Sequence, residues 1–145
     1  MWTDLIASLP GTAITRKAAT EADLRDAERE LGHPLPAELA ALLAESNGID
    51  GEYELGLVWP VGRIVKENRA LRGDGHLARL YKPLFMPFDP LLFFADAGNG
   101  DMFAVVLHTG KPDVYAWDHE NDSRTWVAPS LSRYLEWWTS GRISL

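Results

Sequence analysis

The chain contains no cysteine, which excludes disulfide bonds, a thiolate nucleophile and a cysteine-based zinc site. It also lacks a run of about 18 apolar residues, the length that a membrane span requires. The N-terminus has no basic leader, and Pro10 interrupts the apolar stretch that follows it, so we expect no secretory signal. Together these absences predict a cytoplasmic protein that does not enter a membrane.

An excess of positive charge is absent as well. Lys and Arg number 14 against 21 Asp and Glu, which gives a formal net charge of -7. Such a surface repels phosphate backbones, so we expect no direct contact with nucleic acid. A basic protein partner would instead be attracted. Solubility alone also explains an acidic surface, and the net charge does not decide between these readings.

The length of 145 residues, with 46% hydrophobic and 24% charged residues, is typical of one soluble globular domain spanning 1–145. The sequence contains no internal repeat and no low-complexity tract. Six tryptophans provide much apolar surface. Burying one tryptophan removes roughly 200 Å² from water, which is worth about 5 kcal/mol. Such a core needs neither a metal nor a disulfide to hold it.

The first half of the chain predicts helices. Thr20 and Asp23 form a capping-box pattern, and the apolar periodicity that follows stops at Gly32. Pro36 suits the first turn of the next helix, which we expect to end at Asn47-Gly48. The other expected helices are a short N-terminal one capped by Thr3, one over residues 61–71, and a closing amphipathic one over residues 130–140.

The second half predicts strands. The run from Tyr53 to Val61 reads as extended, with Tyr53, Leu55, Leu57 and Trp59 on one face. An irregular, proline-rich segment is expected over residues 82–90. Short connections then favour an antiparallel meander, whose expected strands cover residues 91–95, 102–107, 114–118 and 124–127. The first two of these are apolar on both faces, as in strands covered on both sides. The predicted fold class is therefore α+β, with a mainly antiparallel β-meander sheet packed by helices.

Acidic residues gather around the turns of this expected sheet. The turn at 96–101, in which Gly98, Asn99 and Gly100 suit positive φ angles, leaves the sheet at the same end as the turn at 118–123. Their carboxylates would form a negative rim that docks a basic partner. Ordinary turn chemistry, in which Asp and Asn bond their own backbone, is the alternative reading. The acids concerned are Asp96, Asp101, Asp113, Asp118, Glu120 and Asp122.

Metal binding and catalysis find little support in the sequence. Asp118, Glu120 and Asp122 alternate like the start of a calcium loop, but Ser123 replaces the glycine that such a loop needs. His119 lacks the spacing of a zinc pair, and adjacent strand residues point to opposite faces. We expect no catalytic residue, no metal and no cofactor. Catalysis would require that folding bring a histidine beside Asp96 or Asp101, and this possibility stays open.

Several segments together resemble the SUKH superfamily, which is named in part for yeast regulators of cell-wall glucan synthesis. The matching pieces run in order from the first helix pair to the closing helix: Leu31-Gly32, Leu35 to Leu39, Ser46-Asn47-Gly48, Leu57 to Pro60, Leu92 to Asp101, Val114 to Glu120, and Leu131 to Trp138. The resemblance implies an α+β fold. It also implies a binding cleft at the positions of Trp59, Asp96, Gly98, Asp101, Trp117 and Asp118. Adding the acidic turns gives the expected partner-binding set: Trp59, Asp96, Gly98, Asn99, Asp101, Trp117, Asp118, Glu120 and Asp122.

Bacterial members of this superfamily resemble immunity proteins, which bind and block a toxin domain of their own cell. The resemblance therefore implies an immunity-type protein that occludes a cognate toxin domain, such as a basic nuclease or deaminase. A regulatory or scaffold domain of the same fold is the alternative, and a metal-dependent enzyme using Asp101, Asp118 and a histidine is a third. The sequence leaves homo-oligomerisation open.

Overall fold

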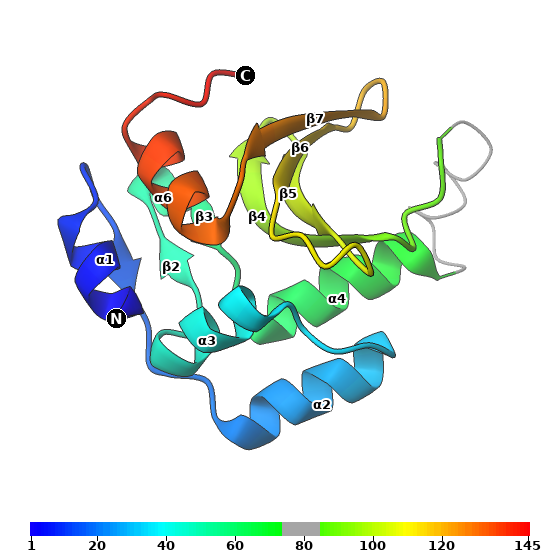
Figure 1. Ribbon diagram of the computed structural model, residues 1–145, viewed down its shortest axis with the longest axis horizontal. Coiled ribbons are helices and arrows are strands. Elements are labelled where there is room, and N and C mark those ends of the chain that lie inside the picture. The colour runs from blue at the N-terminus through cyan, green and yellow to red at the C-terminus, as the bar shows by residue number, and fades with distance from the viewer. Residues whose placement is uncertain (74–84) are drawn as a thin grey trace.

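The computed structural model describes residues 1–73 and 85–145. Within them the fold is α+β, with α-helices and two antiparallel sheets (Figure 1). The helices are α1 (Trp2–Ser8), α2 (Glu21–Leu31), α3 (Ala37–Glu45), the 3-10 helix η1 (Glu52–Glu54), α4 (Val61–Arg72) and α6 (Leu131–Thr139). The strands are β1 (Ile14–Thr15), β2 (Ile49–Asp50), β3 (Gly56–Val58), β4 (Leu91–Gly98), β5 (Asp101–Val106), β6 (Val114–Asp118) and β7 (Ser123–Ala128).

The larger sheet has the strand order β4-β5-β6-β7, which confirms the predicted meander. The smaller sheet has the order β1-β2-β3, and the backbone N–H of Trp59, just after β3, donates to the carbonyl of Phe94 in β4 at 2.8 Å. Figure 1 shows the larger sheet strongly curved, with α4 along it and α2 beyond α4. The predicted irregular segment over 82–90 lies partly outside the described residues.

Local sequence signals account for α2. The hydroxyl of Thr20 accepts a hydrogen bond from the backbone N–H of Asp23, and the Asp23 carboxylate accepts one from the N–H of Thr20, both at 3.0 Å. Gly32 ends the helix with a left-handed φ of 81°. The predicted cap of α1 is wrong, because the helix begins at Trp2 and the Thr3 hydroxyl donates to the carboxylate of Glu45 at 3.4 Å.

The predicted strand from Tyr53 to Val61 is also wrong in its first half. There the chain forms η1, and β3 covers Gly56–Val58 alone. The N–H of Gly51 donates to the carbonyl of Leu55 at 2.7 Å, which closes the tight connection between β2 and β3. Tyr53 consequently points into solvent and is 98% exposed. Alternating large apolar residues predict a strand. Here, however, the chain must reverse direction between the paired strands β2 and β3, and these residues form that connection.

A single cluster of buried apolar side chains includes residues from both sheets and from all five α-helices of the described part. Trp59 and Trp117 are buried at 0% and 2% exposure, whereas Trp126 is half exposed. Trp137 and Trp138 are partly buried against this cluster. Trp59 and Trp117 thus lie in the core that the composition predicts, whereas Trp126 does not.

Asn68 is a buried polar residue that joins α4 to the larger sheet. Its side-chain amide donates to the carbonyls of Ile64 at 2.7 Å and of Phe93 at 2.8 Å, and its oxygen accepts from the N–H of Phe93 at 2.9 Å. Every polar group of this buried side chain is therefore paired with the backbone.

Candidate functional site

The β4–β5 and β6–β7 turns lie side by side at one end of the larger sheet. The backbone N–H of His119 donates to Asp101 Oδ1 at 3.1 Å, and the ring Nδ1 of His119 lies 2.7 Å from the same oxygen. The meander thus places the two acidic turns together. We call Asp101, Asp118 and Glu120, together with the turn residues Gly98 and Asn99, the strand-end surface.

The β4–β5 turn follows from its sequence. Asn99 and Gly100 have φ angles of 54° and 88°, as in the Asn-Gly hairpin turn that matches strand twist, and Gly98 has a φ of 93°. A Cβ at Gly100 would lie 3.1 Å from the ring of His119. The glycine therefore lets the imidazole pack closely on the turn.

Asp96 is partly buried and is paired within the fold. Its carboxylate accepts hydrogen bonds from the N–H of Gly56 at 3.1 Å and from the two terminal nitrogens of Arg63 at 3.0 and 2.8 Å. The guanidinium of Arg63 also lies 4.4 Å from the ring centroid of Trp59. The charge of Asp96 is therefore balanced, and its predicted contribution to a negative rim is reduced.

Asp122 is likewise engaged within the protein. Its side chain is 8% exposed and accepts hydrogen bonds from the indole N–H of Trp117 at 2.8 Å, from Arg124 at 3.0 Å and from the N–H of Met86 at 2.9 Å. This network makes Asp122 a structural residue that anchors the β6–β7 turn to the core.

Of the other two carboxylates of the strand-end surface, Asp118 is partly exposed and Glu120 is exposed. Asp118 accepts the N–H of Glu120 at 2.9 Å within its own turn, and among the described residues neither side chain has a cationic partner at ion-pair distance. The Asp101 hydrogen bond raises the pKa of His119, and the nearby charges of Glu120 and Asp118 add to this effect. Asp113 lies at the opposite sheet end, where it accepts the indole N–H of Trp126 at 3.1 Å.

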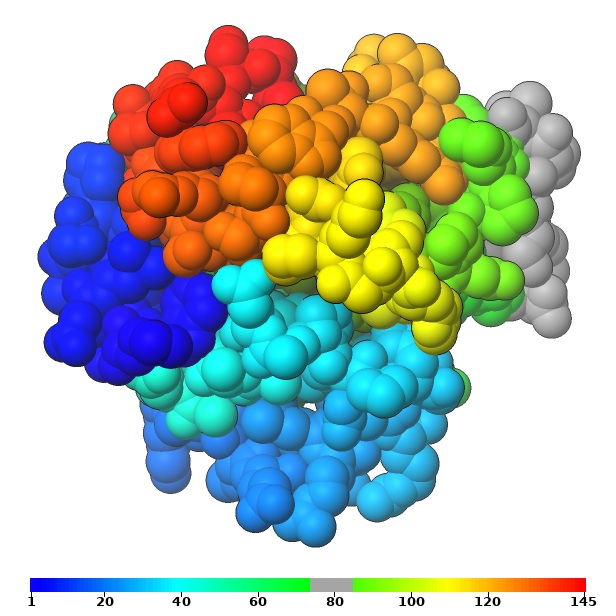
Figure 2. Space-filling view, in the orientation of Figure 1, coloured from blue at the N-terminus to red at the C-terminus, as the bar shows by residue number. Residues whose placement is uncertain are grey.

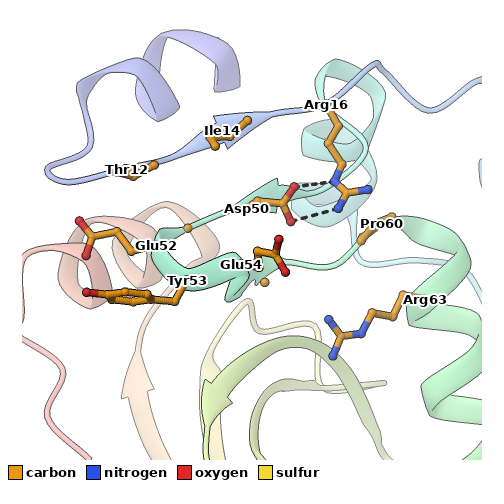
Figure 3. A pocket seen from close by; sticks show the side chains of 11 residues that line it. Thr12, Ile14, Arg16, Asp50, Glu52, Tyr53, Glu54, Pro60 and Arg63 are labelled. Carbon is orange, nitrogen blue, oxygen red and sulfur yellow. Dashed lines mark hydrogen bonds and ion pairs between the residues drawn. The ribbon is translucent and has the colours of Figure 1, made fainter.

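An open cleft of about 980 Å³ is lined in part by Gly56 and Arg63, the two residues that bind the Asp96 carboxylate. β1, the β2–β3 connection and the start of α4 form its walls, and Figure 3 shows Arg63 on α4 facing the residues of that connection. Arg16 is held by Asp50 through two hydrogen bonds of 2.9 and 3.1 Å. The cleft is lined by Thr12, Ile14, Arg16, Asp50, Gly51, Glu52, Tyr53, Glu54, Gly56, Pro60 and Arg63.

The cleft presents negative charge and one aromatic ring to solvent. Glu52 and Glu54 are exposed and have no ion pair among the described residues, whereas both arginines of the cleft are matched by aspartates. No pattern in the sequence predicts this cleft, because Tyr53 and its neighbours match a strand pattern. Nor does any local signal point to Arg63, whose partner Asp96 is 33 residues away.

Two of the predicted site residues cannot touch a partner directly. Trp59 and Trp117 are buried and support the strand-end surface and the cleft from below. Gly98, Asn99, Asp101, Asp118 and Glu120 are at least partly accessible. Their role in partner binding stays a prediction.

Folding also brings together a set of residues with metal-ligand atoms. One atom each of Asp101, Asp118 and His119 lies within 4.8 Å of the others. Asp101 Oδ1, however, is already engaged by the N–H and the ring of His119. Neither the cleft nor the second large cavity of the described residues is lined by His119. Contact between the two turns therefore explains this geometry without an ion.

Helices packed on an antiparallel meander, with an acidic strand end and an open cleft, define a small α+β domain. The chain belongs to the SMI1/KNR4 family (SUKH-1), whose family model matches residues 18–137, from the segment before α2 into α6. A comparison with curated proteins finds no match. Within the described residues, no helix has both the length and the apolar character needed to cross a bilayer.

Proposed function

We propose that this protein is an immunity-type binding module, which neutralises a cognate toxin domain by covering that enzyme's basic substrate groove. Membership of the SUKH-1 family favours protein binding over catalysis. The observation that carries the proposal is a set of four carboxylates that have no cationic partner among the described residues. Asp118 and Glu120 lie on the strand-end surface, and Glu52 and Glu54 lie at the cleft.

The geometry suits tight binding to a basic enzyme. Unpaired surface carboxylates raise the rate of encounter with a positively charged groove, and a large aromatic side chain at the centre of an interface slows dissociation. Tyr53, 98% exposed beside two free glutamates, is the aromatic residue placed for this role. Asp96 joins the two regions, because its partners Gly56 and Arg63 both line the cleft.

Co-expression with the protein encoded beside this one tests the proposal. The readouts are rescue of growth and co-purification of a complex. Replacing Asp118 and Glu120 together by Lys should weaken the complex and reduce protection, while the thermal unfolding midpoint stays close to that of the parent. Asp96 is unsuitable for this test, since its carboxylate holds Arg63 and Gly56 in place.

The matched control changes Glu21 and Asp26 to Lys. Both lie exposed on α2, away from the strand-end surface, and the change in net charge is the same. The control should protect as well as the parent. If both double variants lose protection equally, net charge rather than this surface is responsible. If neither does, the strand-end surface is not the docking face. A complex that forms without rescuing growth would support the regulatory or scaffold alternative.

The third reading, a metal-dependent enzyme, has one observation in its favour, the proximity of Asp101, Asp118 and His119. Equilibrium dialysis against Zn²⁺ and Mn²⁺ tests it. Stoichiometric binding that His119→Ala abolishes would support a metal centre, and the absence of binding would remove this reading.

A further inference from the structure

A second cavity, of about 580 Å³, lies between the α2–α3 connection, the β5–β6 connection and the start of α6. Figure 2 shows these three segments meeting on one face of the molecule. The cavity shares no lining residue with the cleft or with the strand-end surface. Its volume falls within the range of small-molecule sites, which is about 300–1,000 Å³. Its apolar walls include Leu35, Leu39, Phe94, Val105, Leu107 and Leu131, all of them buried.

The polar side chains around this cavity are mostly basic. His33, His108 and Lys111 line it, and Glu38 is the one acid among its lining residues. Lys111 is exposed and has no ion pair among the described residues. This local character contrasts with the net charge of -7 for the whole chain.

Arg72 adds a partly buried positive charge behind His33. One terminal nitrogen lies 2.9 Å from His33 Nε2, and the other donates to the carbonyl of Leu91 at 2.8 Å. Its Nε is buried without a hydrogen-bond partner, and no carboxylate of the described residues lies within ion-pair distance. Burial lowers the pKa of Arg72, and the charge of Asp89, which is not within ion-pair distance, offsets this only in part. A further anion near this position would therefore be stabilised.

The same contact fixes the role of His33. Arginine only donates hydrogen bonds, so His33 Nε2 must accept, and Nδ1 then carries the proton that it donates to the carbonyl of Pro34 at 3.0 Å. Both ring nitrogens of His33 are thus already engaged in hydrogen bonds. An incoming anion therefore has Lys111 and His108 as its available donors, with the charge of Arg72 behind His33.

We propose that this cavity binds a small amphipathic carboxylate. The apolar body lies among the leucines and Phe94, and the carboxylate lies at the mouth beside Lys111 and His108. A concave cavity of this size suits a small molecule, whereas protein partners bury broad surfaces of about 800 Å² on each side. This site is independent of the proposed toxin-binding function.

Titration of the ¹⁵N-labelled full-length chain with decanoate tests the site. The matched probes are 1-decanol and decyltrimethylammonium, which carry the same alkyl chain without the negative charge. Decanoate should bind at one saturable site and shift the amide signals of Leu35, Leu107 and Lys111. Decanol should bind about fivefold more weakly, as expected from the loss of an exposed ion pair, and the ammonium compound more weakly still.

Two variants locate the ligand. Lys111→Gln should weaken decanoate about threefold to fivefold and leave decanol unchanged, while Lys17→Gln, at an exposed lysine outside the cavity, should change neither. Ala37→Trp should block both probes, because Ala37 is exposed and lines the mouth. Ala41→Trp, on the same helix but outside the cavity lining, is its control.

Three results would overturn the proposal. Equal affinity for decanoate and decanol would show that no anion is recognised. Binding that Ala37→Trp leaves intact would place the ligand elsewhere. Tighter binding of an acetylated leucine peptide with a free carboxyl end would assign the cavity to the C-terminus of another polypeptide.

Discussion

The guanidinium of Arg63 contacts Asp96 and Trp59 at once: its nitrogens lie 2.8 and 3.0 Å from the carboxylate oxygens and its central carbon lies 4.4 Å from the indole centroid. A lysine ammonium has no planar fork for two parallel hydrogen bonds and stacks poorly on an aromatic ring. We expect Arg63→Lys to lower the free energy of unfolding by about 1 kcal/mol, measured by urea denaturation.

Arg25→Lys is the control for this change. Arg25 pairs with Glu21 on the exposed face of α2, at 3.3 Å, so its replacement should alter stability by less than about 0.5 kcal/mol. Equal effects of the two substitutions would show that the paired geometry of Arg63 adds nothing to stability.

Gly56 is required where β3 passes close to the Asp96 carboxylate. A Cβ there would lie 2.7 Å from Trp59 Cδ1 and 2.9 Å from Asp96 Oδ2. We expect Gly56→Ala to destabilise the fold by about 1–3 kcal/mol. Gly62→Ala, in the first turn of α4 with no atom within 4 Å of the added Cβ, should stabilise it by about 0.5–1 kcal/mol. Thermal unfolding of the two variants should therefore shift in opposite directions.

Tyr53 combines backbone strain with full exposure. Its φ of 56° and the φ of 60° at Glu54 both fall in the left-handed region, and a 98% exposed ring contributes little packing in return. Tyr53→Gly should raise the free energy of unfolding by about 1 kcal/mol. If the ring is the central contact for a partner, the same variant should bind the toxin at least about tenfold more weakly. A variant that is more stable and binds normally would remove Tyr53 from the interface.

The His119–Asp101 contact predicts a pH dependence. Hydrogen bonding to Asp101 raises the pKa of His119 above its ordinary value of 6.5. The stabilisation is therefore fully present below that value and is lost as the pH rises through the folded-state pKa. The difference in unfolding free energy between the parent and Asp101→Asn should be larger at about pH 5.5 than at about pH 8.5. A difference that does not change with pH would contradict a charged contact.

Those parts of the fold that depend on neighbours in the chain follow from the sequence. The capping box of Thr20 and Asp23 involves residues three positions apart. The β4–β5 turn depends on Gly98, Asn99 and Gly100, residue types that adopt positive φ angles more readily than others. The meander follows in turn from short connections, and it places the β4–β5 and β6–β7 turns together.

The site was less predictable, because its chemistry depends on distant pairs. Asp96 looked like a free surface acid, but Arg63, 33 residues away, neutralises it. Asp122 likewise looked exposed, although Trp117 and Arg124 draw it into the interior. An acid in a turn carries the same local signal whether or not a distant cation reaches it. Tyr53 lies in the β2–β3 connection and not in the predicted strand, because an apolar alternation does not reveal where the chain must reverse between two paired strands.

The Asn68 side chain joins α4 to the middle of β4 by bonding with both backbones. If α4 separates from β4, the Asn68 amide and the Phe93 backbone lose their hydrogen-bond partners in the buried interior, which is costly. The helix and the strand should therefore separate only when the whole protein unfolds. Deuterium uptake at the Phe93 amide should accordingly be among the slowest in the chain and should match the uptake at Asn68's own helical neighbours.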